Sequence, residues 1–413
     1  MFKDQHLLII CTVWPEPASS AAGSRMLELI RVFLEQGCQI TLASDANSTE
    51  YSFDFTGLNV NLLSIELNNS SFDEQLKQIQ PTMVLFDRFM TEEKYGWRIT
   101  EQCPGALKLL DTEDLHCLRK ARQDAFKAGK TFVEDDLISD TAKREIASIY
   151  RCDLSLIISP FEMGLLQDYF RIDKQLLHYL PFLSDPVTEN QIAQWPAFSN
   201  REHFVTIGNF FHEPNVNSVF YLKEDIWPLI RKKMPSAQMH IYGAYAPDKI
   251  INLQNAKQGF LIKGRAPDSK TVISNARVLL APLRFGAGIK GKLSEAMQYG
   301  TPSVTTSIGA EGMKGDNAWN GFVANSPDEI ADAAVTLYAD EKLWKQSQLN
   351  GVNIINTVFS KEKHIPLFLD RLLQIQNTIA AHRTHNFIGA MLLHHSMAGT
   401  KYMARWIELK NKP

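Results

Sequence analysis

Short apolar runs alternate with stretches of helical periodicity along most of the chain. After the run at residues 7–12, apolar residues recur every three or four positions from 26 to 33, and a new run begins near 39. A few apolar residues in a row are typical of a strand buried on both faces of a parallel sheet. In the first half of the chain we expect strands at 7–12, 39–43, 83–86, 107–110 and 154–158. The alternation predicts strand–helix–strand units with parallel strands.

The same alternation resumes after a stretch that contains several prolines. Pro181, Pro186 and Pro196 lie in a segment with little periodicity, which we interpret as a linker. Beyond it we expect strands at 204–207, 238–242, 260–263, 278–281, 303–306 and 321–324. A chain of 413 residues is long enough for two hydrophobic cores. We therefore expect two α/β domains, each with a doubly wound parallel sheet, at 1–185 and 201–375, with a linker at 186–200 and a helical extension at 376–413.

The composition is that of an ordinary globular protein, with 45% hydrophobic and 22% charged residues. The net charge of −3 gives no reason to expect a nucleic-acid partner. The five cysteines are odd in number and include no C-x-x-C pair, which favours reduced thiols in the cytoplasm. The beginning of the chain has no signal-peptide pattern, and no apolar run approaches the roughly 20 residues that span a bilayer.

The segment from Val278 to Met313 carries the most specific pattern in the chain. A strand-like run is followed by a turn that contains Gly286, Gly288 and Gly291, and then by a helical segment. The turn therefore lies at the carboxyl end of a parallel strand, which is where open α/β sheets bind ligands. Glycine lets the backbone approach a ligand closely, and the amino end of the following helix attracts phosphate.

Two charged residues at this helix indicate a diphosphate ligand. Lys290 lies at about the first turn, where a cation opposes the helix dipole unless an anion lies between them. Lys292 and Glu295 are three positions apart and can form a surface ion pair worth roughly 0.2–0.5 kcal/mol. For Lys292 we favour this surface role. For Lys290 and Glu295 we favour a ligand role. Lys290 and the loop amides would hold a pyrophosphate, and Glu295 would accept hydrogen bonds from ribose hydroxyls.

Residues 286–291 also match the G-x-G-x-x-G pattern of dinucleotide-binding oxidoreductases. The match is weak on its own. A Rossmann fingerprint normally follows the first strand of its domain, whereas this one follows several strand–helix units. No acidic residue ends the next strand, which closes with Val304, Thr305 and Thr306. The sequence therefore argues against hydride transfer.

The same segment resembles the donor-site signature of group 1 glycosyltransferases (glycosyltransferase family 4-like) with the GT-B fold, in the subgroup whose glycine loop reads G-A-G-I-K. The matching residues are Pro282, Leu283, Arg284, Gly286, Ala287, Gly288, Ile289, Lys290, Lys292, Glu295, Ala296, Met297, Gly300, Pro302, Val304, Thr306, Gly309, Ala310, Glu311 and Gly312. The resemblance implies two Rossmann-like domains that face each other across a cleft. Many members have a glutamate eight residues before Glu295, where this chain has Ala287.

The resemblance also assigns residues to the donor. In the second domain these are Gly208, Asn215, Gly243, Arg284, Gly286, Gly288 and Ile289, together with Lys290 and Glu295. In the first domain the loop before the first helix faces the donor phosphates, which makes Gly23 and Arg25 candidates; a helix cap with a solvated arginine is the alternative. The loop at 208–215 lacks the lysine-glycine pair of typical members, which shifts the phosphate contact to Lys290 and to Arg284.

A second group of polar residues follows the predicted strand at 107–110. The group contains Asp111, Glu113, Asp114 and His116. Asp114 fits the cap of the next helix. The resemblance places a D-x-x-D pattern here, on the acceptor side of the cleft. We expect Asp111 or His116 near the transferred sugar or the acceptor hydroxyl; a structural role for the histidine is the alternative.

Two further segments have a simpler interpretation. Ser159 and Glu162 fit a helix cap, in an S-x-x-E pattern that the family usually shares. The segment at 382–413 is apolar and basic, and we expect a helix that packs on the first domain and is broken at Gly399. The alternative is an amphipathic helix on an anionic membrane surface, which would make a cytoplasmic protein peripheral to the membrane.

The resemblance implies a glycosyltransferase that moves a sugar from a nucleotide-diphosphate sugar to an acceptor hydroxyl, in bacterial surface polysaccharide or glycan assembly. The acceptor would be a glycan, a lipid-linked molecule or a protein, and the reaction would retain the anomeric configuration. No Asp-x-Asp pair occurs in the chain, so we expect no metal and no cofactor beyond the nucleotide-sugar co-substrate. Alternatives on the same fold are a sugar-nucleotide epimerase or hydrolase, and a non-catalytic sugar-nucleotide-binding protein.

Overall fold

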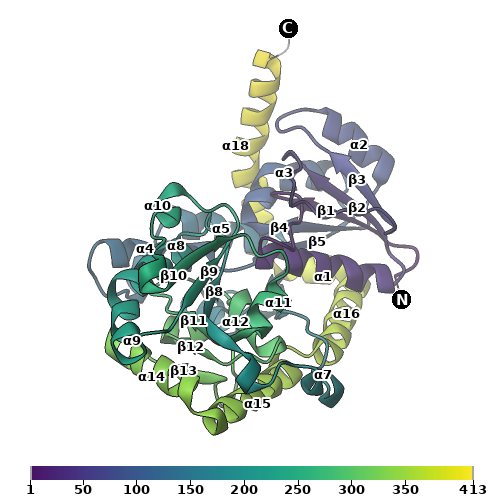
Figure 1. Cartoon of the computed structure of the whole chain (residues 1–413). Helices are drawn as coiled ribbons and strands as arrows, with labels where there is room; N and C mark the ends of the chain where they lie inside the picture. The colour runs from purple at the N-terminus through teal and green to yellow at the C-terminus, as the bar shows by residue number, and fades with distance from the viewer. Residues whose placement is uncertain (1, 412–413) are drawn as a thin grey trace.

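The computed structural model describes residues 2–411, which form two α/β lobes (Figure 1). The strands of the first lobe are β1 (His6–Cys11), β2 (Gln39–Ser44), β3 (Val60–Ser64), β4 (Met83–Asp87), β5 (Leu107–Asp111), β6 (Leu154–Ile157) and β7 (Leu177–Tyr179). Its helices are α1 (Ala21–Glu35), α2 (Ser71–Ile79), α3 (Arg88–Gln102), α4 (His116–Lys127), α5 (Asp140–Arg151) and α6 (Pro160–Gly164), with the short η1 (Glu134–Leu137), η2 (Leu165–Tyr169) and η3 (Lys174–Leu176).

The second lobe repeats this plan. Its strands are β8 (Glu202–Ile207), β9 (Met239–Tyr242), β10 (Phe260–Gly264), β11 (Ala276–Ala281), β12 (Ser303–Thr305) and β13 (Gly321–Val323). Its helices are α7 (Glu189–Ala193), α8 (Glu213–Tyr221), α9 (Trp227–Lys233), α10 (Asp248–Ile251), α11 (Ser269–Ser274), α12 (Gly291–Gln298), α13 (Ser307–Ala310), α14 (Pro327–Ala339) and α15 (Glu341–Val358), with the short η4 (Phe198–Asn200), η5 (Leu222–Ile226) and η6 (Ala256–Gln258).

All strand pairs in both sheets are parallel, which confirms the predicted fold class. The strand order is β3-β2-β1-β4-β5-β6-β7 in the first sheet and β10-β9-β8-β11-β12-β13 in the second. In each sheet the order reverses after its first strand in the chain, between β1 and β4 and between β8 and β11. These reversals are topological switch points, where the loops at the carboxyl ends of the strands diverge and leave room for a ligand.

Each sheet is buried on both faces, as its apolar strands require. In β1, Leu8 and Ile10 belong to one core of the first lobe, whereas Leu7 and Ile9 belong to the core on the opposite face. Successive side chains of a strand point to opposite faces, so a strand between two helical layers must be apolar throughout. The second lobe has two equivalent cores around its own sheet.

The chain returns to the first lobe earlier than the sequence predicts. The backbone of Ser184 bonds to that of Phe359, so the outgoing and returning segments lie side by side. The next helix, α16 (Lys361–Asn377), packs on the first sheet, with the Phe368 ring 5.9 Å from that of Phe33. The sequence assigned residues up to 375 to the second domain. That assignment was wrong for α16 because its apolar spacing marks a buried face but not the sheet it covers.

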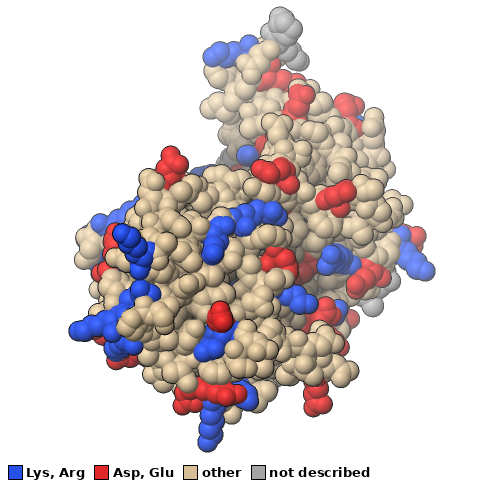
Figure 2. Space-filling model, viewed as in Figure 1, with Lys and Arg blue, Asp and Glu red and all other residues tan. Residues whose placement is uncertain are grey.

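The chain ends in α17 (Ile379–His385) and α18 (Phe387–Asn411), and α18 projects beyond the first lobe (Figure 1). Met397 and Ala404 pack against Trp97 of α3. The expected break at Gly399 is absent: the helix continues through this residue, and apart from the adjacent helix backbone no atom lies within 4 Å of where a Cβ of residue 399 would be. Within the described residues, no helix is both long and apolar enough to span a bilayer. Positive and negative side chains are interspersed over the face in Figure 2.

Candidate functional site

The glycine loop after β11 meets the first lobe directly. Gly288 has φ +65°, in the left-handed region that favours glycine. A Cβ at Gly288 would lie only 2.7 Å from the Cβ of Asp114, so any larger residue would push the lobes apart. Ala287 is also buried, among apolar residues of the first-lobe core. The loop therefore forms part of the contact between the two lobes.

Glu162 of the first lobe binds this loop. Its side chain is fully buried, and Oε1 accepts hydrogen bonds from the amides of Leu115 (3.0 Å) and Gly288 (2.8 Å). Burial raises the pKa of Glu162 to about 8. The helix cap predicted for Ser159 and Glu162 is therefore wrong, because the Ser159 side chain makes no capping bond and Glu162 connects the two lobes.

Lys290 is the N-cap residue of α12 and is 7% exposed. Its Nζ donates a 2.6 Å hydrogen bond to the carbonyl of Gly288. Burial lowers the pKa of Lys290 to about 8, although the carboxylates of Glu311 and Glu162 favour its charged form. No carboxylate lies within 4 Å of Nζ in the part of the chain that the structure describes. Lys290 is thus a buried cation without a direct counter-ion.

Lys292 also lacks a counter-ion, and it faces a different loop. Its Nζ donates a 2.8 Å hydrogen bond to Oδ1 of Asn215, at the start of α8. A Cβ at Gly208 would lie 3.0 Å from this Nζ, so the glycine makes room for the lysine. Burial lowers the pKa of Lys292 to about 8. The predicted ion pair between Lys292 and Glu295 is wrong, since Lys292 turns toward Asn215.

Glu295 is half-buried on α12 and accepts a 3.2 Å hydrogen bond from the Ser269 hydroxyl. Burial raises the pKa of Glu295 to about 7. Gly243, another predicted donor residue, packs the loops behind this site: its Cβ would lie 2.3 Å from the carbonyl oxygen of Gly208 and from the Phe210 ring. The backbone amides of Gly291 and Lys292 donate to no protein atom among residues 2–411. The amino end of α12 therefore combines unpaired N–H groups with two lysines.

Two other predicted donor residues are engaged by the protein itself. The Nε of Arg284 donates a 2.8 Å hydrogen bond to Asn217, and its guanidinium stacks between the rings of Phe126 and Tyr221. Ile289 is buried in the core beneath the second sheet. Their contact with a donor stays a prediction.

In the first lobe, Arg25 and Asp111 form a fully buried ion pair. The Nε of Arg25 lies 3.0 and 2.9 Å from the two carboxylate oxygens, and Nη1 donates to the carbonyl of Pro181. Gly23 packs closely on the backbone of Glu16: a Cβ at Gly23 would lie 2.4 Å from the carbonyl carbon of Glu16. In this structure Arg25 and Asp111 satisfy each other, and their contact with substrate stays a prediction.

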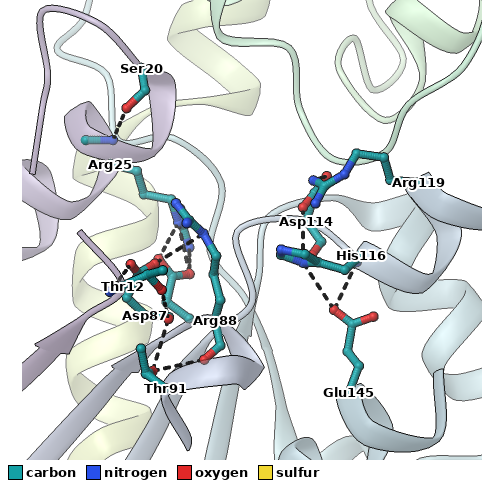
Figure 3. Close-up of polar contacts among 12 residues, drawn as sticks. Thr12, Ser20, Arg25, Asp87, Arg88, Thr91, Asp114, His116, Arg119 and Glu145 are labelled. Atoms are coloured by element: carbon teal, nitrogen blue, oxygen red, sulfur yellow. Dashed lines mark hydrogen bonds and ion pairs between the residues drawn. The ribbon is translucent and has the colours of Figure 1, made fainter. Parts of the chain in front are cut away.

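His116 begins α4 and lies between two carboxylates (Figure 3). Its Nδ1 is 3.5 Å from Asp114 Oδ1 and 3.5 Å from Glu145 Oε1. The cap predicted for Asp114 is wrong: Glu145 accepts the first amides of α4, from His116 and Cys117, at 2.9 Å each. Asp114 instead pairs with Arg119. Burial opposes its ionisation, but the charges of Arg119 and of His116 hold the pKa of Asp114 well below its usual range.

Further contacts hold the lobes together, and sequence reasoning missed them. Arg122 of α4 pairs with both carboxylate oxygens of Glu311 at 2.8 Å and donates to the carbonyl of Gly286 at 2.9 Å. The hydroxyl of Tyr245 lies 3.1 and 3.0 Å from the carboxylate oxygens of Glu16. Each partner is distant in sequence, so local spacing carries no signal for these pairs.

The amino ends of α1 and α12 also meet at this interface. A Cβ at Gly291, the first residue of α12, would lie 2.6 Å from the Cβ of Ala21, the first residue of α1. The amino ends of the two helices are therefore in direct contact across the interface between the lobes.

Residues 201–340 match the family model described as glycosyl transferases group 1. No curated protein matches the sequence. Solved structures with a similar fold include a mutant of TarM from S. aureus in complex with fondaparinux, alpha-GlcNAc-glycerol and UDP, with 15% identity, a TM-score of 0.55, and coverage of 74% of this chain and 58% of TarM.

Two further similar structures are covered along almost their whole length. HepE from Anabaena, in complex with UDP and glucose, has 11% identity and a TM-score of 0.64, with 89% of this chain and 99% of HepE covered. WaaG, a glycosyltransferase involved in lipopolysaccharide biosynthesis, has 12% identity and a TM-score of 0.60, with 85% of this chain and 95% of WaaG covered. At these identities the likeness establishes the fold. The chain therefore has the fold of these structures, and residues 201–340 of its second lobe are similar to glycosyl transferases group 1.

Proposed function

We propose that the enzyme transfers a hexosyl group from a nucleotide-diphosphate sugar to an acceptor hydroxyl, with the diphosphate bound at the amino end of α12. One observation supports this site above the others: Lys290, Lys292 and Glu295 have only neutral hydrogen-bond partners within the described chain. Keeping buried charges unpaired is costly. A diphosphate supplies the missing negative charge, and ribose hydroxyls supply donors for Glu295.

The proposed mechanism is electrostatic. When the bond between the anomeric carbon and the β-phosphate oxygen breaks, negative charge builds up on the diphosphate. In this proposal the ammonium of Lys292 and the amides of Gly291 and Lys292, which donate to no described backbone acceptor, stabilise that charge. The acceptor oxygen then bonds to the anomeric carbon and loses its proton. Closure of the lobes keeps water away from the reacting carbon.

Of the two candidates near the acceptor hydroxyl, Asp111 and His116, we propose that His116 lies close to it. Asp111, the other candidate, is held by Arg25 and is fully buried. His116 is half-buried and has two carboxylates at 3.5 Å, which stabilise an imidazolium if the ring takes the acceptor proton. We further propose that the reaction retains the anomeric configuration and needs no metal, with the lysines and helix amides in the place of a divalent cation.

UDP is the carrier that we favour, because HepE and the TarM mutant were both crystallised with UDP. The function of WaaG in lipopolysaccharide biosynthesis supports a role in bacterial surface glycan assembly. A non-catalytic sugar-nucleotide-binding protein is the second candidate, since Ala287 replaces a glutamate that many relatives carry.

We also propose peripheral membrane contact through α18. Tyr402, Met403, Trp406 and Leu409 are 57–67% exposed on the outer side of the helix, next to Lys401, Arg405 and Lys410. Aromatic and basic residues in this arrangement suit the headgroup region of an anionic bilayer. Sedimentation with vesicles of anionic lipid should recover the protein, and Trp406→Ser should weaken that recovery. Equal recovery with neutral vesicles, or with neither kind, would refute the proposal.

Incubation with UDP-, GDP- and TDP-sugars tests the transferase function. We expect slow release of one nucleoside diphosphate without an acceptor and faster release with a glycan acceptor. Lys292→Ala should abolish release, whereas Lys249→Ala, which removes an exposed lysine of the same lobe, should leave it unchanged. Binding without release would favour the non-catalytic candidate, and the absence of binding would refute the donor site.

A further inference from the structure

Glu162 has one carboxylate oxygen that the protein does not use. Oε1 accepts two amides, one from each lobe, whereas Oε2 is buried and has no hydrogen-bond partner within the described chain. A buried polar oxygen without a partner, ionised or protonated, costs about 1–3 kcal/mol. The helix that carries Glu162 does not need this residue as a cap, so its burial has no local explanation.

The position of Glu162 relative to the proposed diphosphate limits what this oxygen can contact. Its Oε1 lies 2.8 Å from the amide of Gly288, and Gly288 is two residues before the N-cap of α12. If the diphosphate binds at the tip of α12, the sugar attached to its β-phosphate extends one bond beyond, toward this loop and the first lobe. Glu162 is the first-lobe carboxylate that bonds to the loop at this point.

The loop itself offers no carboxylate for the sugar. Ala287, in the middle of the loop, packs into the apolar core of the first lobe. A charged side chain at 287 would have to enter that core. Asp114 is close to Gly288, but it is neutralised by Arg119.

We propose that Glu162 recognises the transferred sugar. Its Oε2 hydrogen-bonds a hydroxyl of the hexosyl group, while Oε1 connects the two lobes by accepting hydrogen bonds from the amides of Leu115 and Gly288. The inference rests on the proposed function, since it requires a donor at the tip of α12. Glu162 is then a specificity-determining residue that lies in the opposite lobe from the rest of the donor site.

Two substitutions separate the two oxygens. Glu162→Gln keeps a carbonyl oxygen in the place of Oε1, so the bonds to both amides remain, but it replaces Oε2 with an N–H₂ group. Glu162→Ala removes both. Asp168→Asn, a carboxylate further along the same segment, is the matched control.

The readouts are the dissociation constants of UDP and UDP-glucose, and kcat and KM for transfer from UDP-glucose. Measured at pH 9, where the Glu162 carboxyl is ionised, Glu162→Gln should keep the melting temperature and the UDP affinity of the unmodified protein but lower kcat/KM at least tenfold. Glu162→Ala should lower kcat/KM further and also lower the melting temperature. Asp168→Asn should change none of these values.

Two results would overturn the inference. One is a Glu162→Gln enzyme with unchanged kcat/KM, which would mean that Oε2 is not used. The other is an equal loss of UDP and UDP-glucose affinity in Glu162→Ala with full rescue by Gln, which would leave Glu162 only a structural role. A failure of the proposed function is distinct from both, because the unmodified protein would then not bind UDP, GDP or TDP.

Discussion

Two groups of charged side chains, one in each lobe, have partners of opposite kinds. In the first lobe Arg25 pairs with Asp111, and Arg119 pairs with Asp114. In the second lobe Lys292 bonds to an amide oxygen and Glu295 to a hydroxyl. A group paired within the protein contributes to stability, whereas an unpaired group at a ligand-facing loop is available for a ligand. The difference assigns the first lobe's ion pairs to the fold and the second lobe's single charges to the donor.

The largest expected effect is on stability, in the first lobe. Asp111→Asn removes the counter-ion of a fully buried Arg25, and breaking a buried pair from one side typically costs about 3–5 kcal/mol. We expect a large fall in the melting temperature of the first lobe, measured by calorimetry. A variant as stable as the unmodified protein would contradict the assignment of this pair to the fold.

The next effect is on affinity, in the second lobe. Lys292→Ala removes a charge-assisted contact, typically about 1.5–3 kcal/mol, or roughly a ten- to 150-fold rise in the dissociation constant of the nucleoside diphosphate. Arg119→Ala removes a first-lobe cation that already has a counter-ion, and should change this constant less than threefold. Titration calorimetry measures the dissociation constant for both variants. A larger loss of affinity in Arg119→Ala than in Lys292→Ala would contradict the contrast between the two lobes.

A third effect concerns pH. The pKa of Glu295 is raised to about 7 in the folded protein from 4.5, so the folded state holds a proton that the unfolded state releases. This group therefore favours folding at low pH, and its contribution is lost as pH rises from about 4.5 to 7. The effect is on the order of 1 kcal/mol, because the side chain is partly solvated.

Comparison with Glu295→Gln isolates this contribution from that of Glu28, whose pKa is also raised to about 7 by burial. The melting temperature of the unmodified protein, minus that of the variant, should fall between pH 5 and pH 7 and level off above it. A difference that rises with pH would show that Glu295 has a cationic partner.

The smallest effect belongs to an exposed pair of the first lobe. Arg144 and Glu93 form an ion pair whose arginine side chain is 55% exposed. Glu93→Gln should change the free energy of unfolding by less than about 1 kcal/mol, as exposed pairs typically do. A loss comparable to that of Asp111→Asn would show that burial does not govern these energies.

The fold could be predicted because it depends on local periodicity. The β1, β5 and β11 strands were visible as apolar runs, and the glycine loop was visible from its spacing. The lobe that α16 covers could not be predicted, since an amphipathic helix shows that it has a buried face and not what covers it. The break at Gly399 was a wrong inference from residue type, because a solvated glycine is tolerated within a helix.

The candidate site was predictable only in its local part. The tip of α12 followed from the loop and helix pattern. The sequence pattern predicted a ligand role for Lys290 and only a surface ion pair for Lys292. The second prediction was wrong because the partner of Lys292 is Asn215, 77 residues away. Glu162 was taken for a cap since the sequence shows its neighbours along the chain and not Gly288 in the other lobe. Contacts across the cleft come from tertiary structure, which residue spacing does not encode.

The most direct test of the account is titration calorimetry of the unmodified protein with UDP, GDP and TDP and with the matching nucleosides. If Lys290 and Lys292 at the amino end of α12 bind a diphosphate, one of the nucleoside diphosphates should bind roughly 100-fold more tightly than its nucleoside. Equal affinity for a diphosphate and its nucleoside would contradict the account, because the two lysines would then contribute nothing to binding.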